Sequence, residues 1–413
     1  MNIREIRITP VAFRDPPLLN AAGVHEPWAL RTIVEVITDE GLSGLGETYG
    51  DLDHLEKMRE SAEALIGLDV HALNTIYARI TDIVGDVVTD LHGLTGVSTK
   101  EKSIDRVFSP FEVACLDIRG KAAGVPVVDL LGGRVRDAVP YSAYLFYKWA
   151  AEDRFGAALD PDGLVAQASV FIKENGFRSI KLKGGVFEPE QEIAAIRALH
   201  EAFPGVPLRL DPNAAWSVET SIAVGRELDG LLQYLEDPTA GIEGMAQVAP
   251  HVPMKLATNM CVVTPEHLPP AIAQGAIGVL LLDHHYWGGL TRSAHVAALC
   301  ATFGLELSMH SNSHLGISLA AMTHLAAATP NLNHACDTHT PWQDGQDVVK
   351  PGALRFVDGA VPVPAGPGLG VELDREALER MHADYLACGI TSRDDTTYMQ
   401  QFEPAFSARR PRW

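Results

Sequence analysis

Short apolar runs alternate with helical patterns along the chain from about residue 140 onward. Each run is almost continuously apolar, which is typical of parallel strands buried on both faces of a sheet. The segments between them carry helix patterns, such as the apolar stripe of Ile193, Ile196 and Leu199. The pattern predicts eight strands, at 140–146, 179–183, 208–211, 231–236, 254–259, 279–283, 305–310 and 333–337.

A closed (β/α) barrel of the TIM type is the simplest arrangement for eight such units. An open doubly wound sheet is the alternative, but no G-x-G-x-x-G motif follows the first of these strands. The pair Gly44 and Gly46 lacks the required spacing, and the glycines at 366–370 come after the last strand. We therefore expect a barrel domain at 136–345.

The first third of the chain has a different pattern. Strand-like runs at 4–11, 29–38 and 44–47 come first, and a mainly helical segment at 55–135 follows. Strands followed by helices predict a separate α+β domain, at residues 1–135.

Composition narrows the range of partners. The chain has 413 residues, 46% of them apolar, and a formal net charge of −20. So negative a surface argues against nucleic acid and anionic membranes as partners. No apolar run reaches the length of a membrane span, and the five cysteines form no C-x-x-C pair, so we expect free thiols in a cytoplasmic protein.

Polar side chains stand where six of the predicted strands end. In such a barrel, catalytic groups lie at the C-terminal ends of the strands. Any one of these residues alone is more often a turn or a solvated strand edge. Their recurrence every 23 to 28 residues, close to one strand–helix unit, is what indicates a site. They are Lys181 and Lys183, Asp211 and Asn213, Glu236, Asn259, Asp283, and His310.

Three of these residues offer only oxygen ligands. Asp211, Glu236 and Asn259 end adjacent strands, which suits a hard cation such as Mg²⁺. The alternative for the two carboxylates is ion pairing with barrel lysines, but the amide Asn259 has no place in that alternative. The absence of an H-x-H pair lowers the weight of a zinc site.

The remaining strand-end residues predict acid–base chemistry. Lys181 and Lys183 are two apart on one strand and point to the same side, so repulsion favours a neutral amine on one of them. Asp283 can orient His310 from the neighbouring strand end. Together with a metal ion, these groups predict removal of a proton next to a carboxylate, with Mg²⁺ stabilising the ene-diolate.

At this point the chain resembles the mandelate racemase branch of the enolase superfamily, and within it the glucarate dehydratases. The branch pattern is K-x-K, then Asp, Glu and a third ligand, then an Asp–His pair; asparagine as third ligand is the mark of the glucarate dehydratases. The motifs that carry the resemblance are the segments 181–185, 210–213, 236–238, 258–260, 310–312, 337–339, 368–372 and 393–395, together with His25.

The resemblance implies a (β/α)₇β barrel under a capping domain that the C-terminal tail, 346–413, completes. It implies that Lys183 is the base and that His310, paired with Asp283, is the opposite acid–base group. It implies that Asp211, Glu236 and Asn259 bind Mg²⁺. It implies substrate binding by His25, Tyr144, Lys181, Asn213, Ser311, Asn312, His339 and Arg393, with a threonine that is either Thr95 or Thr99.

The implied activity is Mg²⁺-dependent dehydration of an acid sugar, D-glucarate to 5-dehydro-4-deoxy-D-glucarate, by a homo-oligomer. The alternatives are a dehydratase or epimerase of another acid sugar such as galactarate, or a catalytically silent paralogue. The segment 147–162 is shorter than the insertion expected at this place in the family. This segment follows the first barrel strand, so we expect it to lie near the substrate.

Overall fold

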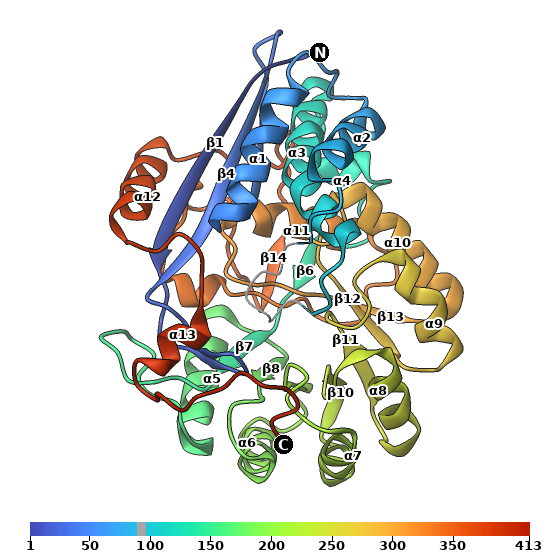
Figure 1. Ribbon diagram of the computed structural model, residues 1–413, viewed down its shortest axis with the longest axis vertical. Helices are drawn as coiled ribbons and strands as arrows, with labels where there is room; N and C mark the ends of the chain where they lie inside the picture. Colours follow the sequence, from blue (N-terminus) through green and yellow to red (C-terminus); the bar gives the residue numbers. More distant parts are fainter. Residues whose placement is uncertain (89–95) are drawn as a thin grey trace.

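The computed structural model describes residues 1–88 and 96–413. Its N-terminal part is an antiparallel sheet in the order β1–β4–β5, covered by helices (Figure 1), which confirms the predicted α+β capping domain. The strands are β1 (Ile3–Arg14), β4 (Trp28–Thr38) and β5 (Ser43–Tyr49), and the helices are α1 (Leu52–Leu65), α2 (Leu73–Val84), α3 (Lys100–Ala123) and α4 (Val127–Leu130).

Strand β5 packs directly against α3 because glycine stands where the two backbones meet. A methyl group added at Gly44 would overlap the carbonyl oxygen of Ala114, and one added at Gly46 would overlap that of Pro110. The glycine pair therefore serves close packing between strand and helix.

Seven parallel strands form a curled sheet in the order β13–β12–β11–β10–β9–β8–β7, with helices around its outer face (Figure 1). The strands are β7 (Ala143–Phe146), β8 (Ile180–Lys183), β9 (Leu208–Asp211), β10 (Leu232–Glu236), β11 (Lys255–Thr258), β12 (Val279–Leu282) and β13 (Glu306–Met309). The helices are α5 (Pro161–Asn175), α6 (Pro189–Ala202), α7 (Val218–Glu227), α8 (Gly241–Val248), α9 (Leu268–Ala273), α10 (Gly289–Phe303) and α11 (Gly316–Ala328).

The eighth predicted strand, 333–337, is not a regular strand. The segment makes isolated bridges instead, from Leu332 to Leu307 beside β13 and from Cys336 to Tyr141 beside β7. Side chains replace part of the missing ladder, because Oδ1 of Asn333 accepts a hydrogen bond from the backbone of Leu307 at 3.1 Å. The segment thus closes the barrel between β13 and β7 without forming a full ladder with either.

Local sequence signals explain where helix α5 begins and ends. The Asp160 side chain accepts a hydrogen bond from the backbone N–H of Gly163 at 2.8 Å, and Pro161 occupies the first helical position. At the other end Gly176 adopts the left-handed conformation, with φ of 72°.

The C-terminal segment returns to the capping sheet. Strand β14 (Ala360–Pro362) pairs antiparallel with β6 (Ala138–Pro140), and helix α12 (Arg375–Ala387) packs on β1 (Figure 1). The last helix, α13 (Asp395–Gln400), lies beside β3 (Gly23–Val24). The predicted domain boundaries at 135 and 345 stay predictions.

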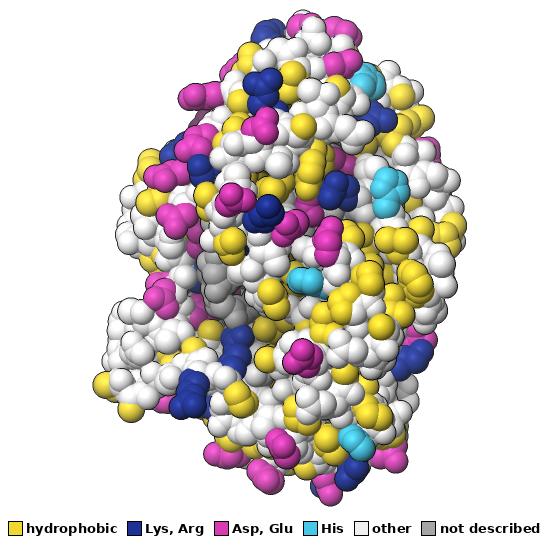
Figure 2. Space-filling view, turned by 45° about the vertical axis from the view of Figure 1, so that its right-hand side comes forward, with side chains coloured by type: hydrophobic (Ala, Val, Ile, Leu, Met, Phe, Trp, Pro, Cys, Tyr) yellow, Lys and Arg dark blue, Asp and Glu magenta, His cyan; other side chains and the backbone are white. Residues whose placement is uncertain are grey.

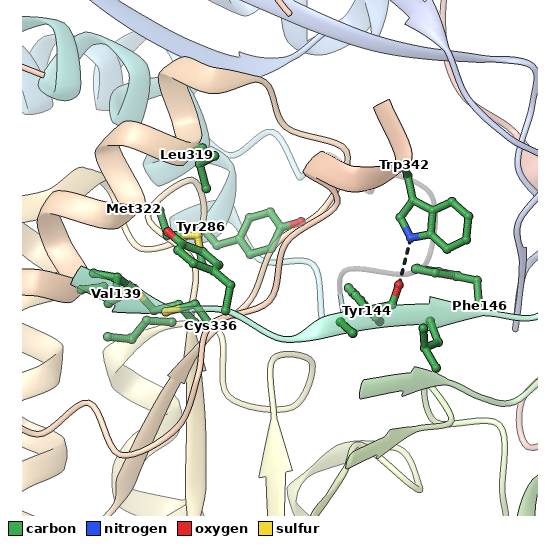
Figure 3. Packing of buried hydrophobic residues seen from close by; sticks show 14 of the residues in the cluster. Val139, Tyr144, Phe146, Tyr286, Leu319, Met322, Cys336 and Trp342 are labelled. Carbon is green, nitrogen blue, oxygen red and sulfur yellow. Dashed lines mark hydrogen bonds between the residues drawn. The ribbon is translucent and has the colours of Figure 1, made fainter. Parts of the chain in front are cut away.

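An aromatic cluster fixes β7 to the turn η3 (Thr340–Gln343). The indole Nε1 of Trp342 donates a hydrogen bond to the backbone carbonyl of Tyr144 at 2.9 Å (Figure 3). The Trp342 ring packs on Phe146, and Phe155 from the short segment after β7 contacts it with ring centroids 4.6 Å apart.

The last features of the fold are the charged side chains on the surface and the state of the cysteines. Acidic and basic side chains are interspersed on the face shown in Figure 2. All five cysteines are free, as predicted. Among residues 1–88 and 96–413, no helix is long and apolar enough to span a bilayer.

Candidate active site

A polar cavity opens at the C-terminal ends of the barrel strands. Its walls come from β7, from Lys183 at the end of β8, from the segment after β13, and from both ends of the chain. Eight of the residues predicted to form the site line it. The lining residues are Asn20, His25, Tyr144, Phe146, Lys183, His310, Ser311, Asn312, Ser313, His339 and Arg393.

Three oxygen donors lie buried at the ends of adjacent strands. Asp211 and Glu236 end β9 and β10, Asn259 follows β11, and all three are at most 3% exposed. Within the described part of the chain, Oδ1 and Nδ2 of Asn259 and Oε1 of Glu236 have no hydrogen-bond partner. An unsatisfied buried polar group costs about 1–3 kcal/mol, so this arrangement indicates a ligand.

The charges of this group also suit a cation. Burial raises the pKa of Glu236 well above its usual range, and the charge of Asp211 adds to the effect although Lys181 opposes it. Carboxylate and amide oxygens are what Mg²⁺ binds in proteins. The three residues therefore fit a magnesium ion.

Asp237 holds Asn259 in place. Its Oδ2 accepts a hydrogen bond from the backbone N–H of Asn259 at 2.9 Å, and its Oδ1 accepts one from the hydroxyl of Thr258 at 2.5 Å. Burial raises the pKa of Asp237 to about 7. Sequence reasoning missed this residue, although it stands next to Glu236.

The two predicted lysines have different surroundings. Lys181 is fully buried and does not line the cavity; its Nζ lies 2.7 Å from Oδ2 of Asp337 and 2.7 Å from Oε2 of Glu236. Burial opposes its charge, but these carboxylates raise the pKa of Lys181 well above its ordinary value. Lys181 thus contacts protein carboxylates, and its contact with a substrate stays a prediction.

Lys183 reaches the cavity. Its Nζ lies 2.7 Å from Oδ2 of Asp211 and donates a hydrogen bond to Oδ1 of Asn213. Asn213 does not line the cavity, and it has the left-handed φ of 55°, which asparagine tolerates better than most residues. The turn after β9 thus aims an amide oxygen at the lysine.

His310 and Asp283 form the predicted pair. Nδ1 of His310 lies 2.9 Å from Oδ2 of Asp283, and Nδ1 of His285 lies 2.7 Å from Oδ1. Although burial opposes ionisation, the two histidines lower the pKa of Asp283 well below its ordinary value. Because Nδ1 of His310 faces the carboxylate, Nε2 is the atom left for a ligand.

Both chain ends supply the far wall of the cavity. The guanidinium of Arg393 binds Asp395 through two hydrogen bonds, of 2.7 and 2.8 Å, and Asn20 donates to the same carboxylate at 2.8 Å. Nδ1 of His25 lies 3.0 Å from Oδ2 of Asp15. The cations expected here are therefore balanced by two carboxylates, so this wall offers hydrogen-bond donors rather than excess positive charge.

The remaining predicted residues are His339 and the threonine, either Thr95 or Thr99. The ring of His339 contacts those of Tyr144 and Phe146, and burial lowers the pKa of His339 well below its ordinary value, so the ring is neutral. The hydroxyl of Thr99 caps helix α3 by accepting from the backbone of Lys102, away from the cavity lining. Thr95 lies outside the described residues.

A family model described as enolase C-terminal domain-like matches residues 163–377, which is more than half of the chain. The matched residues hold Lys183, the three oxygen donors and the Asp283–His310 pair.

The chain belongs to the enolase superfamily.

Its similarity to known members of the superfamily extends over the whole length. A probable glucarate dehydratase of Streptomyces coelicolor is 52% identical, over 100% of this chain and 99% of that protein. A crystal structure of an enolase from Thermobispora bispora, complexed with magnesium and formate, is 75% identical, with a TM-score of 0.99 and full coverage of both chains. An enolase from Mycobacterium smegmatis, complexed with tartrate, is 61% identical, with a TM-score of 0.96 over 100% of this chain and 98% of that one.

Within residues 1–88 and 96–413, one other group has the composition of a metal site. Asp283, His284 and His285 lie buried with their ligand atoms close together. Hydrogen bonds account for Asp283 and His285, because Asp283 binds His285 and His310 while Nε2 of His285 contacts Ser318 at 2.9 Å. We therefore assign this group to the acid–base pair.

The residues that contact the predicted site residues were harder to predict from the sequence than the site residues themselves. Asp337 and Asp395 stood in recognised motifs, which was the available signal, but their contacts with Lys181 and Arg393 depend on the folded chain. Asn20 and His285 carried no signal in spacing or pattern.

Proposed function

We propose that this protein is a Mg²⁺-dependent dehydratase of acid sugars that converts D-glucarate to 5-dehydro-4-deoxy-D-glucarate. The observation that carries the proposal is the presence of Lys183 and of His310, held by Asp283, in one polar cavity next to buried oxygen donors. The relationship to a probable glucarate dehydratase supports the same chemistry.

We assign the metal to Asp211, Glu236 and Asn259. The unsatisfied buried oxygens of Glu236 and Asn259 support the assignment, as does the magnesium in the related Thermobispora bispora structure. When bound, Mg²⁺ would stabilise the negative charge that develops on the substrate carboxylate after the α-proton has left.

Lys183 would take the α-proton. Its Nζ lies in the cavity wall, and the proton that it accepts would leave it as an ammonium group. Oδ2 of Asp211 at 2.7 Å and the amide oxygen of Asn213 are placed to accept hydrogen bonds from that ammonium. The strand end thus supports the charged product of the first step.

His310 would complete the elimination. Nε2 gives its proton to the hydroxyl on the β-carbon, the carbon–oxygen bond breaks with its electron pair going to oxygen, and water leaves. The α–β double bond that results is an enol, which becomes the ketone of the product. Asp283 stabilises the charged form of the imidazole through the 2.9 Å contact to Nδ1.

The polar lining supports a hydroxylated dicarboxylate as substrate. Among the described lining residues only Phe146 lacks a polar side-chain group. His25, Asn20 and Arg393 offer donors at the wall opposite the strand ends, where a second carboxylate can bind. The tartrate complex of the Mycobacterium smegmatis relative contains a hydroxylated dicarboxylate and agrees with this assignment.

Purified protein, incubated with Mg²⁺ and a panel of acid sugars under proton NMR, tests the proposal. Dehydration of D-glucarate above all other substrates supports it. Preference for galactarate, or epimerisation without loss of water, would instead favour the alternative acid-sugar activities. No turnover or α-proton exchange with any member of the panel would indicate a silent paralogue.

A further inference from the structure

A buried hydrogen-bonded chain runs from the capping sheet to the acid–base pair. Nη2 of Arg31, on β4, lies 3.1 Å from Nε2 of His285. On its other side His285 places Nδ1 2.7 Å from Oδ1 of Asp283, whose Oδ2 contacts His310. The acid–base pair is therefore linked, through one histidine, to a residue of the other domain.

Arg31 is fixed at this place by Glu47 on β5. Its Nε donates to Oε1 of Glu47 at 2.8 Å, and both side chains are at most 2% exposed. The same carboxylate accepts the backbone N–H groups of Leu315 at 2.7 Å and Ser318 at 2.9 Å, at the start of helix α11. The guanidinium is thus held against both the capping sheet and the barrel.

The contact with Arg31 decides where His285 carries its proton. A guanidinium is always a donor, so Nε2 of His285 must accept and has no proton of its own. The single ring proton is then on Nδ1, where it is donated to Asp283. The hydroxyl of Ser318, at 2.9 Å from Nε2, can donate or accept and imposes neither state alone.

Two further imidazoles, those of His284 and His314, lie near this ring. Burial lowers the pKa of His314 to about 3, with Arg31 contributing, and burial lowers the pKa of His284 well below its ordinary value. The rings of His284 and His285 lie 4.0 Å apart. The guanidinium of Arg31 is the permanent cation that His285 contacts.

We propose that Arg31 is a positioning residue for the acid–base reaction, and that it acts by keeping His285 neutral with its proton on Nδ1. Asp283 then receives a neutral donor on Oδ1, where the backbone N–H of His285 also binds at 2.9 Å. Its negative charge stays available to His310 instead of being neutralised by a second imidazolium. The tautomer does not depend on the proposed function; its effect on catalysis rests on it.

Nitrogen NMR of the full-length protein, labelled at histidine, tests the tautomer without any substrate. The His285 signals are assigned by their absence in His285→Gln. In the wild-type protein we expect Nδ1 protonated and Nε2 unprotonated at neutral pH; in Arg31→Met we expect Nε2 to gain a proton. A proton on Nε2 in the wild type, or an unchanged His285 spectrum in Arg31→Met, overturns the proposal.

A matched control is Arg375→Met. Arg375 also binds a glutamate of β4, Glu35, at 2.8 Å, but lies away from the site and is 57% exposed. Because Arg31→Met leaves Glu47 buried without its partner, the double variant Arg31→Met with Glu47→Gln provides a second background. Both backgrounds should give the same change at His285, and Arg375→Met should give none.

Activity gives the second readout. With D-glucarate, Arg31→Met should slow dehydration about 10- to 100-fold, because a misplaced catalytic group costs of that order, while α-proton exchange by Lys183 stays near the wild-type rate. Equal losses of exchange and dehydration would indicate a merely structural role and contradict the proposal. If wild-type protein neither exchanges nor dehydrates any acid sugar, the proposed function fails and the tautomer result still stands.

Discussion

Nζ of Lys183 lies 2.7 Å from Oδ2 of Asp211, so the proposed base touches a proposed metal ligand. The strand register sets this contact, because Lys183 pairs with Asp211 between β8 and β9. A change at Asp211 would therefore disturb both functions at once. Asn259 is the sharper probe of the metal alone, because its side chain has no hydrogen-bond partner among the described residues.

Metal removal should abolish activity, and Mg²⁺ should restore it. Mg²⁺ should also raise the midpoint of thermal unfolding of the wild-type protein, since a ligand at a hundredfold excess over its Kd stabilises by about 2.7 kcal/mol. In Asn259→Ala and Asp211→Ala both effects should largely disappear while the proteins stay folded. Full activity in metal-free buffer would contradict the site assignment.

The two acid–base groups should separate in deuterium exchange. In D₂O, His310→Asn should still exchange the α-proton of D-glucarate but dehydrate it about 10²–10⁴-fold more slowly, because the leaving hydroxyl has lost its acid. Lys183→Ala should lose both reactions on D-glucarate and can retain exchange on the C5 epimer, L-idarate. Proton NMR measures both rates. Wild-type dehydration by His310→Asn, or α-proton exchange on D-glucarate by Lys183→Ala, would reverse our assignment of the roles.

The protein should recognise both carboxylates of a dicarboxylate substrate. The wall with His25 and Arg393 offers donors that the monoacid gluconate leaves unused, so kcat/KM for D-glucarate should exceed that for gluconate by about 10² or more. His25→Gln should lower the value for D-glucarate and leave that for gluconate nearly unchanged. Steady-state kinetics on both substrates decide the matter, and equal values for the two would move the function to monoacid sugars.

Asp105, in the capping domain, should make stability depend on pH. Burial raises the pKa of Asp105 from its ordinary value to about 6, although Arg292 opposes the effect. A carboxyl whose pKa is higher in the folded state contributes stability below pH 4, and this contribution is lost as the pH rises to 6. The free energy of unfolding, measured with urea, should change less between pH 4 and 6 for Asp105→Asn than for the wild type, by roughly 2–3 kcal/mol. Parallel curves would show that Asp105 does not titrate in this range.

The barrel was predictable because short, largely apolar runs recur along the chain at about the spacing of one strand–helix unit, with polar side chains at or just after their ends. The segment 333–337 follows at a similar spacing but forms no full ladder, and nothing in its residues shows that Asn333 would bond to the backbone of Leu307. The glycines at 44 and 46 were only excluded from nucleotide binding. Their role against α3 depends on a contact between segments that are remote in the sequence.

The strand-end residues were predictable for a similar reason, since the barrel period brings them to one mouth. The residues that hold them were not. Asp237 orients Asn259 across two strands, and Arg31 reaches His285 from another domain, so both contacts exist only after tertiary packing. For Lys181, strand alternation predicted which side of the sheet the side chain is on. It did not predict the carboxylates of Glu236 and Asp337 that contact it.

The closure of the barrel by isolated bridges has a consequence for its motions. Isolated bridges lack the neighbouring pairs of a regular ladder, so the backbone at the seam between β13 and β7 should open more often than the seven-stranded ladder itself. The seam carries Asp337, which holds Lys181, and leads directly to His339 in the cavity wall. A ligand that contacts His339 would therefore stabilise this seam. Backbone amide hydrogens at 333–337 should then exchange more slowly with solvent when the cavity is filled.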